Sequence, residues 1–381
     1  LQRKGSSVKV ILTKSGKKFV TSLSISSLSK NRVFEDMFDE KNKGKMDHIS
    51  LSRWADAILV LPATANFMSK LSRGSADDLA TTVILAADKE IFLIPAMNVR
   101  MWLHQATQKN FGTLVNYGYK FIGPIDGEMA CGEYGKGKMS SPRQVLSYLE
   151  KFFKEKNYLK KKNISAIVTT GPTREYIDPV RFISNESSGK QGYEIALELS
   201  RLGIKTTLIS GPTNINYNNE IKVKKVTSGK EMFDAVKRTL PTDIAVCSAA
   251  VSDFKPLAKK KQKIKKKLKL EEIKLEYNPD ILEFLGKNNR YKPKLLVGFS
   301  AETENIINNS IEKMENKLCD IMVVNDVSKK GVGFNADFNE VIIIDKKGNA
   351  EKVKKNSKKF IASIIARKIM NSFLDIKKNL N

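Results

Sequence analysis

The chain has 381 residues, a hydrophobic content of 41% and a formal net charge of +26 at pH 7. This length predicts two or three domains with buried cores. No apolar run approaches the roughly 18 residues of a membrane span. The first ten residues contain no apolar signal region and no initiator methionine, so we expect a missing N-terminal piece.

Cysteine spacing and charge bear on three classes of protein: disulfide-rich, zinc-binding and nucleic-acid-binding proteins. Cys131, Cys247 and Cys319 lie far apart and form no C-x-x-C pair, which disfavours disulfides or zinc and favours a reducing, cytoplasmic location. The positive charge favours nucleic-acid binding. However, lysine is spread over the whole chain, and few aromatic residues accompany the densest basic run, 259–269. That run predicts a solvated loop, a lid over an anionic substrate or, less favoured, an RNA-binding segment.

Strand and helix patterns alternate along the chain. Strands are predicted at 8–12, 57–61, 91–94 and 120–122, and then at 164–168, 206–209, 244–247, 295–299, 321–324 and 341–344. Helices are predicted at about 76–87 with Ser75 as N-cap, at 142–156 and at 193–202. This alternation predicts an α/β protein with two doubly wound, Rossmann-like or flavodoxin-like domains and mainly parallel sheets. The predicted domains are residues 1–153 and 164–381, and the polar segment 154–163 is the predicted linker.

Four clusters in the first half carry reactive groups. His48 is one of two histidines, and it is either structural or a proton carrier near neutral pH. The segments 62–66 (PATAN) and 95–98 (PAMN) each follow a strand, where open α/β sheets bind ligands. The segment 130–139 (ACGEYGKGKM) predicts a mobile flap whose lysines and amides let Cys131 donate a proton. Plain surface loops are the alternative interpretation.

In this order, these clusters resemble the flavin-dependent decarboxylases that act on C-terminal or free cysteine carboxylates, over about residues 1–149. The resemblance implies that His48 is the base near the substrate thiol, Asn98 holds the carboxylate and Cys131 protonates the intermediate. The residues that match the family's FMN contacts are Ala63, Thr64, Ala65 and Asn66. In that family FMN oxidises the thiol-bearing carbon to a thioaldehyde, which permits loss of carbon dioxide, and then returns the electrons.

Two features depart from that family. Its first strand and glycine-rich turn, which help to hold FMN, are expected before Leu1. The flap normally ends in Gly-Arg-Met, whereas Lys138 stands here in place of the arginine. Lysine keeps the positive charge but not the bidentate fork.

The stretch 169–192 is the most informative feature of the second half. It follows a predicted strand, precedes a predicted helix and is rich in small hydrogen-bonding groups, although it is not a Walker A sequence. Such a loop can wrap a phosphate at a helix N-terminus, or it can be an ordinary connection. Its glycines, hydroxyls and amide come from Gly171, Ser184, Asn185, Ser187, Ser188, Gly189 and Gly192.

Further clusters follow predicted strands or begin helices. They are 248–255 (SAAVSDFK), 263–266 (KIKK), 278–282 (NPDIL), 298–303 (GFSAET), 325–327 (NDV) and 331–337 (GVGFNAD). The NPDIL segment predicts a helix start with Pro279 early in the helix. Lys313 and Lys317 are four residues apart and share one helix face, although exposed lysines at this spacing are common.

Together these motifs resemble phosphopantothenate–cysteine ligase over about residues 164–345. The resemblance implies that 4′-phosphopantothenate attacks CTP, and that cysteine then attacks the acyl-cytidylate. Asn185, within the substrate loop of Ser187, Ser188 and Gly189, would secure the acyl intermediate. The residues implied to contact the nucleotide or its phosphates are Lys263, Lys313, Lys317, Ala249, Ala250, Asp253, Pro279, Asp280, Ile281, Leu282 and Phe299. Magnesium would accompany the triphosphate.

The combined interpretation is a bifunctional enzyme of coenzyme A biosynthesis. The second half would make phosphopantothenoylcysteine and the first half would decarboxylate it to 4′-phosphopantetheine. One alternative is a ligase whose flavin half is only a scaffold, and a remote one is a basic nucleic-acid-binding protein. Members of the family that this chain resembles form trimers through the flavin half and dimers through the ligase half, and the resemblance therefore implies a homo-oligomer.

Overall fold

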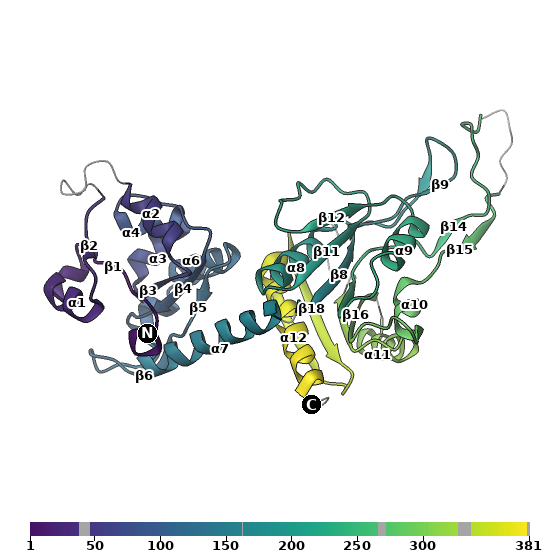
Figure 1. Cartoon of the computed structure of the whole chain (residues 1–381). Coiled ribbons are helices and arrows are strands. Elements are labelled where there is room, and N and C mark those ends of the chain that lie inside the picture. Colours follow the sequence, from purple (N-terminus) through teal and green to yellow (C-terminus); the bar gives the residue numbers. More distant parts are fainter. Residues whose placement is uncertain (38–45, 162, 266–271, 303, 327–336, 379–381) are drawn as a thin grey trace. The chain divides into compact units, whose positions relative to one another are not determined.

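The computed structural model describes residues 1–37, 46–161, 163–265, 272–302, 304–326 and 337–378. The chain divides into two compact units, Leu1–Phe153 and Lys154–Asn381, coloured along the sequence in Figure 1. Both units are α/β with mainly parallel sheets, which confirms the predicted fold class. Within the described residues, no helix is long and apolar enough to cross a membrane.

A three-stranded parallel sheet forms the centre of the first unit. Its order is β3 (Ala57–Ala63), β4 (Glu90–Pro95) and β5 (Lys120–Phe121). A parallel pair, β1 (Val10–Ile11) and β2 (Val33–Phe34), and an antiparallel hairpin, β6 (Ile125–Glu128) and β7 (Tyr134–Lys138), complete its strands among the described residues. Its helices are α1 (Ser22–Ser29), α2 (Asp47–Trp54), α3 (Ala65–Ser72), α4 (Leu79–Leu85), α5 (Val99–Leu103), α6 (Gln105–Asn116) and α7 (Pro142–Lys161).

The central strand of this sheet is buried on both faces. Ile91 and Leu93 point to one face and pack with residues of α3 and α6. Phe92 and Ile94 point to the other face and pack with residues of α7. Every residue of β4 after Glu90 is apolar and buried, which is typical of a parallel sheet between two helical layers, so the sequence pattern correctly predicted this arrangement.

Several boundaries differ from the sequence predictions, and two of them have a clear physical cause. α4 begins at Leu79 rather than near Ala76, and its N-cap is Asp78 rather than Ser75. Asp78 and Thr81 form a reciprocal capping box, which satisfies more of the free backbone N–H groups than a lone serine does. The predicted linker 154–163 is helical as far as Lys161, because its lysines, Glu155 and Leu159 favour a helix and no glycine or proline interrupts them.

An eight-stranded sheet forms the second unit. Its order is β12 (Lys222–Lys225), β11 (Lys205–Ser210), β8 (Ser165–Thr170), β13 (Ile244–Cys247), β16 (Leu295–Glu302), β17 (Ile321–Asp326), β18 (Phe338–Asp345) and β19 (Ala350–Ser357). The first six strands are parallel, whereas β18 and β19 are antiparallel to their neighbours. The helices are α8 (Lys190–Arg201), α9 (Gly229–Lys237), α10 (Ile281–Lys287), α11 (Ile306–Asn316) and α12 (Lys358–Lys378).

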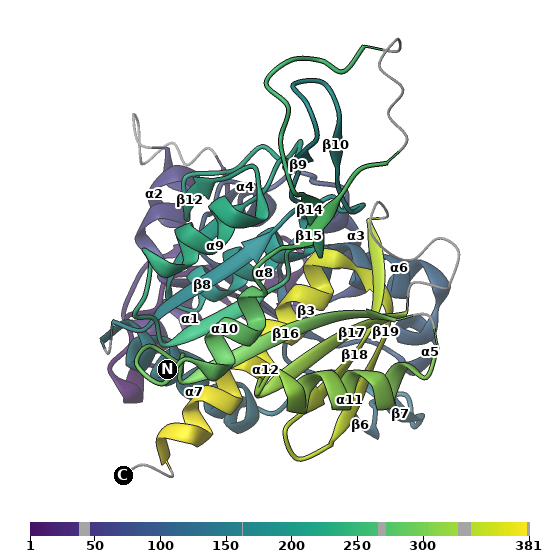
Figure 2. The ribbon, with the colours of Figure 1, turned by 90° about the vertical axis from the view of Figure 1, so that its right-hand side faces the viewer.

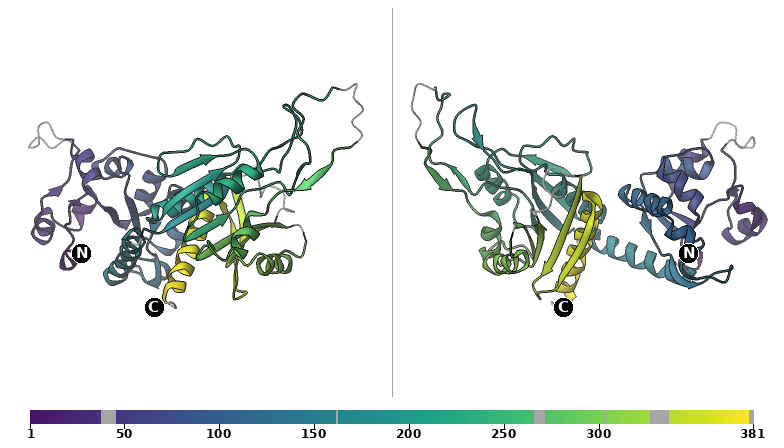
Figure 3. Two further views of the ribbon diagram at one scale, coloured as in Figure 1. Left: turned by 45° about the vertical axis from the view of Figure 1, so that its right-hand side comes forward. Right: turned by 180° about the vertical axis from the view of Figure 1, so that it is seen from behind.

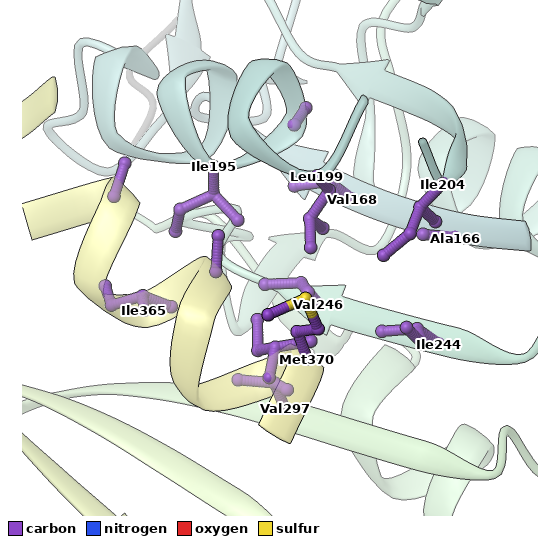
Figure 4. Packing of buried hydrophobic residues seen from close by; sticks show 14 of the residues in the cluster. Ala166, Val168, Ile195, Leu199, Ile204, Ile244, Val246, Val297, Ile365 and Met370 are labelled. Atoms are coloured by element: carbon purple, nitrogen blue, oxygen red, sulfur yellow. The ribbon is translucent and has the colours of Figure 1, made fainter. Parts of the chain in front are cut away.

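Alternate residues of these strands face two separate cores. Val168, Val246 and Val297 pack with Ile195 of α8 and Ile365 of α12 on one face, as Figure 4 shows. α12 also lies along β18 and β19 (Figure 3). The intervening strand residues pack with α9, α10 and α11 on the other face. Helices therefore cover both faces of the sheet and leave the carboxyl ends of the parallel strands for a site.

Two antiparallel hairpins belong to the loops at those strand ends. The first is β9 (Glu175–Tyr176) with β10 (Phe182–Ile183), and the second is β14 (Phe254–Pro256) with β15 (Leu275–Tyr277). β9 contacts β14, and both hairpins project to the same side in Figure 2. They extend the carboxyl edge of the sheet.

Candidate active sites

The first candidate site lies at the switch point of the second unit's sheet, where the strand order reverses at β8. The chain leaves β8 and returns as β11 on one side of it, whereas β13 lies on the other side. The loops that follow β8 and β13 therefore lie beside each other at the carboxyl edge, which is where open α/β sheets bind ligands. The two loops also run together, since Ala250 N donates to Gly171 O at 3.0 Å and Ser252 N donates to Thr173 Oγ1 at 3.1 Å.

Asn185 joins these two loops. Its Nδ2 donates to Val251 O at 3.0 Å, and the side chain remains exposed. The predicted substrate residues Ala249 and Ala250 belong to the same β13 loop and are half-buried. The sequence-predicted residues of the two loops are thus brought together at one edge, with an amide positioned above them.

The glycines of the loop before α8 permit close packing. Gly189 is the N-cap of α8, and its φ of +71° is unfavourable for other residues. A Cβ at Gly189 would lie 2.7 Å from Thr213 Cγ2, and a Cβ at Gly192 would collide with Ser248 and Thr170. Ser187 Oγ accepts a hydrogen bond from Gly189 N at 3.3 Å. The loop therefore presents backbone amides and hydroxyls at the N-terminus of a twelve-residue helix, which suits an anion.

The segment that carries Lys263 is held by a buried carboxylate. Ile264 N donates to Asp178 Oδ2 at 3.1 Å, and Arg181 Nη2 donates to Ile264 O at 2.9 Å. The side chain of Asp178 is fully buried and also accepts from Val180 N and from Arg181. Lys263 itself is exposed. This segment is thus attached to the β9–β10 turn, whereas Lys266 of the KIKK motif lies outside the described residues.

Asp178→Asn is expected to destabilise the second unit at neutral pH. Burial raises the pKa of Asp178, but Arg181 and three backbone N–H groups outweigh it and hold the pKa well below its usual range. The stabilisation is therefore complete above the unfolded pKa of about 3.9 and is lost as the pH falls through the folded value. Thermal unfolding should show a lower Tm at pH 7 and a weaker acid dependence for the variant. The control is Asp234→Asn, a half-buried position on α9 where the carboxylate pairs, among the described residues, only with Lys230, and equal Tm values for the two variants would contradict this role.

Two of the motifs predicted to contact the nucleotide, SAAVSDFK and NPDIL, lie next to each other. Asp253 is exposed, and its backbone oxygen accepts from Asn278 N at 2.8 Å, which connects the SAAVSDFK and NPDIL motifs. The prediction that Pro279 lies early in a helix is wrong, because Asp280 is the N-cap of α10 and accepts from Glu283 N. An aspartate satisfies a free N–H at this position, which proline cannot do. Pro279 therefore precedes the cap.

Lys317 is brought to the same helix start. Its ammonium lies 3.0 Å from Asp280 Oδ2 and 2.6 Å from Glu283 Oε2. Burial lowers the pKa of Lys317, but its bonds to Glu283 and Asp280 outweigh that effect and raise it. Lys313 lies one turn earlier, in the last turn of α11. Lys317 is thus a charged residue beside NPDIL, although two carboxylates already hold it.

Three predicted nucleotide residues have packing roles in this structure. Ile281 and Leu282 are buried in the core under α10. Phe299 is half-buried and packs on the opposite face of the sheet, with the core under α8 and α12. Gly298 precedes Phe299 on β16, and a Cβ at Gly298 would lie 2.8 Å from Leu282 Cδ2. The structure therefore does not bring Phe299 and Leu282 together in one site.

The second candidate site lies at the carboxyl end of β3 in the first unit. Ala63 is fully buried, and Thr64 caps α3 by accepting from Phe67 N at 3.2 Å. Thr64 and Asn66 are exposed, and Ala65 is half-buried. Small side chains and polar groups at a strand end and helix N-terminus fit the anionic chain of a flavin nucleotide. The four residues predicted to contact FMN are contiguous here.

The predicted flap is the β6–β7 hairpin, and it packs on the loop that carries Asn98. Met97 N donates to Gly137 O at 3.0 Å, and a Cβ at Gly137 would collide with Met97 O. Asn98 Nδ2 lies 3.3 Å from Cys131 Sγ, and it also donates to Glu133. Cys131 is exposed. The structure therefore brings the predicted carboxylate-holding amide and the predicted proton donor together.

In the part of the chain that the structure describes, His48 and Lys138 form no hydrogen bond with this pair. Lys138 is exposed on β7 and pairs across the hairpin with Ile125. His48 is half-buried at the start of α2, next to Asp47, which forms an ion pair with Arg32 at 2.8 Å. No hydrogen bond joins His48 to Asn98 or Cys131 among the described residues of this single chain. Its role as a base therefore stays a prediction.

Comparison with known proteins defines the class. Residues 1–154 match the family described as Flavoprotein, and residues 160–373 match the C-terminal domain of DNA/pantothenate metabolism flavoproteins. The chain is therefore a two-part flavoprotein of pantothenate metabolism.

Relatives of nearly full length narrow this class. The chain is 40% identical over 374 residues to the coenzyme A biosynthesis bifunctional protein CoaBC of Haemophilus influenzae, covering 98% of this chain and 92% of the relative. It is 39% identical over 371 residues to CoaBC of Bacillus subtilis, covering 97% and 91%. The chain thus belongs to the family of coenzyme A biosynthesis bifunctional proteins. The predicted bifunctional enzyme of coenzyme A biosynthesis is confirmed.

Two further similarities complete the comparison. The chain is 39% identical over 355 residues to a cysteine/cysteine sulfinic acid decarboxylase of an unknown prokaryotic organism, covering 92% of this chain and 99% of that protein. The crystal structure of the C-terminal domain of a CoaBC protein matches with 33% identity and a TM-score of 0.48, covering 56% of this chain and 96% of that one.

The residues that hold the predicted site residues in place, through contacts with residues distant in sequence, were not identified from the sequence. Glu133 accepts from Asn98 and forms an ion pair with Arg100 at 3.4 Å. Asp178 and Arg181 hold the Lys263 segment. The only available signal was their position inside or beside the recognised motifs, since a single carboxylate in a polar loop does not reveal its partner.

Proposed function

We propose that the second unit, through its predicted domain 164–381, joins 4′-phosphopantothenate to cysteine with CTP, through an acyl-cytidylate. The main support for this proposal is the hydrogen bond from Asn185 Nδ2 to Val251 O. This bond holds an exposed amide beside the loops that follow β8 and β13. An anionic acyl intermediate at this edge would contact the backbone amides of the loop before α8. Mg²⁺ would arrive with the triphosphate, whose oxygens it prefers as ligands.

The ligase proposal predicts two separable half-reactions. The purified protein is incubated with 4′-phosphopantothenate, CTP and magnesium, with cysteine either omitted or added. Pyrophosphate should form in both mixtures, and phosphopantothenoylcysteine should form only when cysteine is present. ATP in place of CTP tests the base preference. Absence of both products from folded protein would contradict the proposal.

Lys263→Gln is expected to slow formation of the acyl-cytidylate. Lys263 is exposed on a segment fixed to Asp178, so its ammonium can reach a phosphate without moving the fold. Loss of one charge-assisted contact should cost about 1.5–3 kcal/mol of transition-state stabilisation, or about 10- to 150-fold in kcat/KM for CTP. The neighbouring exposed Lys261→Gln is the control. Wild-type kinetics of Lys263→Gln across CTP concentrations would support the solvated-loop interpretation.

The first unit, residues 1–153, is proposed to decarboxylate phosphopantothenoylcysteine to 4′-phosphopantetheine with bound FMN. Ala63, Thr64, Ala65 and Asn66 would hold the flavin, which supplies the electron sink for loss of carbon dioxide. The chain's own groups would act on the substrate: Asn98 would bind the carboxylate through its amide. Cys131, 3.3 Å from that amide, would deliver the proton to the carbon that loses carbon dioxide.

The alternative for the first unit is a scaffold without decarboxylase activity. Flavin absorbance of the purified protein and release of carbon dioxide from phosphopantothenoylcysteine distinguish the two. Free cysteine is a second substrate to test, because one relative of similar identity is named a cysteine decarboxylase. A homo-oligomer assembled through both units is also proposed, and sedimentation measurements test it.

A further inference from the structure

One lysine lies buried beneath the substrate loop of the second unit. Lys358 is the first residue of α12 and follows β19, a strand whose other lysines are largely exposed. Only 6% of Lys358 is accessible to solvent. Its Nζ donates to Ser188 Oγ at 3.4 Å, across 170 residues of sequence. A lysine at this boundary therefore contacts the loop that precedes α8.

Backbone contacts fix Lys358 in this position. Gln191 Nε2, in the first turn of α8, donates to Lys358 O at 3.1 Å. Lys358 N donates to Asp337 O at 3.0 Å. Asp337 in turn accepts from Lys190 Nζ at 2.6 Å. The start of α12 is thus joined to Ser188, Lys190 and Gln191, which are the residues around the N-terminus of α8.

The charges around this joint favour an anion. Lys190 faces Lys358 from α8, and Asp337 faces it from the residue before β18. Of the charged groups that the described residues place here, the ammonium groups of Lys358 and Lys190 outnumber the Asp337 carboxylate beside the helix N-terminus, which itself carries a partial positive charge. That excess lies next to the loop proposed to hold the anionic acyl intermediate.

Keeping this ammonium costs stability. Burial and then the charge of Lys190 lower the pKa of Lys358 to about 8, and Asp337 opposes the shift. Because the folded-state pKa lies below the unfolded one, the unfolded chain binds the proton more tightly, and the charge opposes folding at neutral pH. An apolar residue of the same length would fill this space without that cost. Buried charges of this kind cluster at functional sites, and this one contacts the loop before α8.

We propose that Lys358 is a positioning residue of the ligase reaction, which orders the Ser187–Gly189 loop through Ser188 and adds positive charge behind the bound phosphopantothenoyl group. This inference rests on the proposed ligase function. Nothing in the sequence motifs assigns a role to this lysine, which lies outside the stretch of ligase resemblance. The proposal makes the start of α12 part of the substrate site.

Lys358→Met is the principal test. At pH 7 the variant should have a Tm equal to or above that of the wild type, whereas kcat/KM for 4′-phosphopantothenate should fall about tenfold or more. The matched control is Lys355→Met, which removes an exposed lysine of β19 and should leave both quantities unchanged. Unchanged kcat/KM in folded Lys358→Met, with an active wild type, would overturn the inference and leave the proposed function intact. An inactive wild type would instead overturn the proposed function.

A pH profile and a second variant separate positioning from simple packing. In the wild type, kcat/KM for 4′-phosphopantothenate should decline as the pH rises through about 8, where Lys358 loses its charge. This alkaline decline should be absent from Lys358→Met and reduced in Ser188→Ala. The effects of the two substitutions should be less than additive in the double variant, because both remove the same contact. Full additivity, or the same decline in all variants, would contradict action through Ser188. If Lys358→Met fails to fold, Ser188→Ala alone decides by its profile.

Discussion

Asn185→Ala is expected to stop the ligase reaction after activation of the carboxylate. Pyrophosphate should still form, whereas formation of phosphopantothenoylcysteine should fall by about 10²- to 10³-fold, the usual cost of losing a donor that stabilises developing charge. The reason is the position of the amide, which bonds to Val251 O and remains exposed at the switch point. The acyl intermediate would then lose the group that holds it for attack by cysteine.

The two products of this variant must be measured separately. Pyrophosphate release reports activation, and mass spectrometry reports the acyl-cytidylate and the amide product. Asn289→Ala, which removes an exposed amide after α10, is the matched control and should behave as the wild type. Unchanged amide formation in Asn185→Ala would reject the role. Loss of pyrophosphate as well would place Asn185 in the first half-reaction instead.

The main strands were predictable from sequence because burial on both faces leaves a plain signal. The residues of β4 after Glu90 and those of β13 form continuous apolar runs, and a sheet between two helical layers buries both faces of such a run. The small hairpins β9–β10 and β14–β15 were not predicted. Their strands have two or three residues each, and their pairing depends on contacts distant in sequence. Local pattern does not determine such pairs.

The position of the ligase site was predictable for a similar reason. Polar loops after parallel strands lie at one edge, and Asn185 and the Ala249–Ala250 loop, which the resemblance assigned to the substrate and the nucleotide, lie close together there. The supporting contacts were not predictable. Asp178 reaches Ile264 across 86 residues, and Lys358 reaches Ser188 across 170. Their side-chain types fit many environments, and only the folded chain selects the partner.

A residue that belongs to a recognised motif does not always contact the ligand, because its side chain can be buried in the core. Ile281, Leu282 and Phe299 belong to motifs that imply nucleotide contact, yet their side chains fill two cores on opposite faces of the sheet. An apolar residue in a recognised motif can act by placing the backbone near a ligand, without touching the ligand itself. Polar neighbours such as Asp253 and Asp280 are exposed and are better candidates for direct contact.

Cys131→Ser is expected to separate decarboxylation from product formation in the first unit. Cys131 is exposed on the flap, and its Sγ lies 3.3 Å from the amide proposed to hold the substrate carboxylate. The carbon that loses carbon dioxide must receive a proton before product can leave. A serine hydroxyl is a far weaker acid than a thiol, so this transfer should slow by about 10²- to 10⁴-fold.

The measurement uses flavin-containing protein mixed with phosphopantothenoylcysteine. One equivalent of carbon dioxide should be released while 4′-phosphopantetheine accumulates slowly, because the enethiolate waits for its proton. Tyr134→Phe, which removes an exposed hydroxyl from the same hairpin, should release both products at the wild-type rate and controls for disturbance of the flap. Equal rates of both products in Cys131→Ser would remove the thiol from the mechanism. The flap would then act only as a cover that excludes water while Asn98 holds the carboxylate.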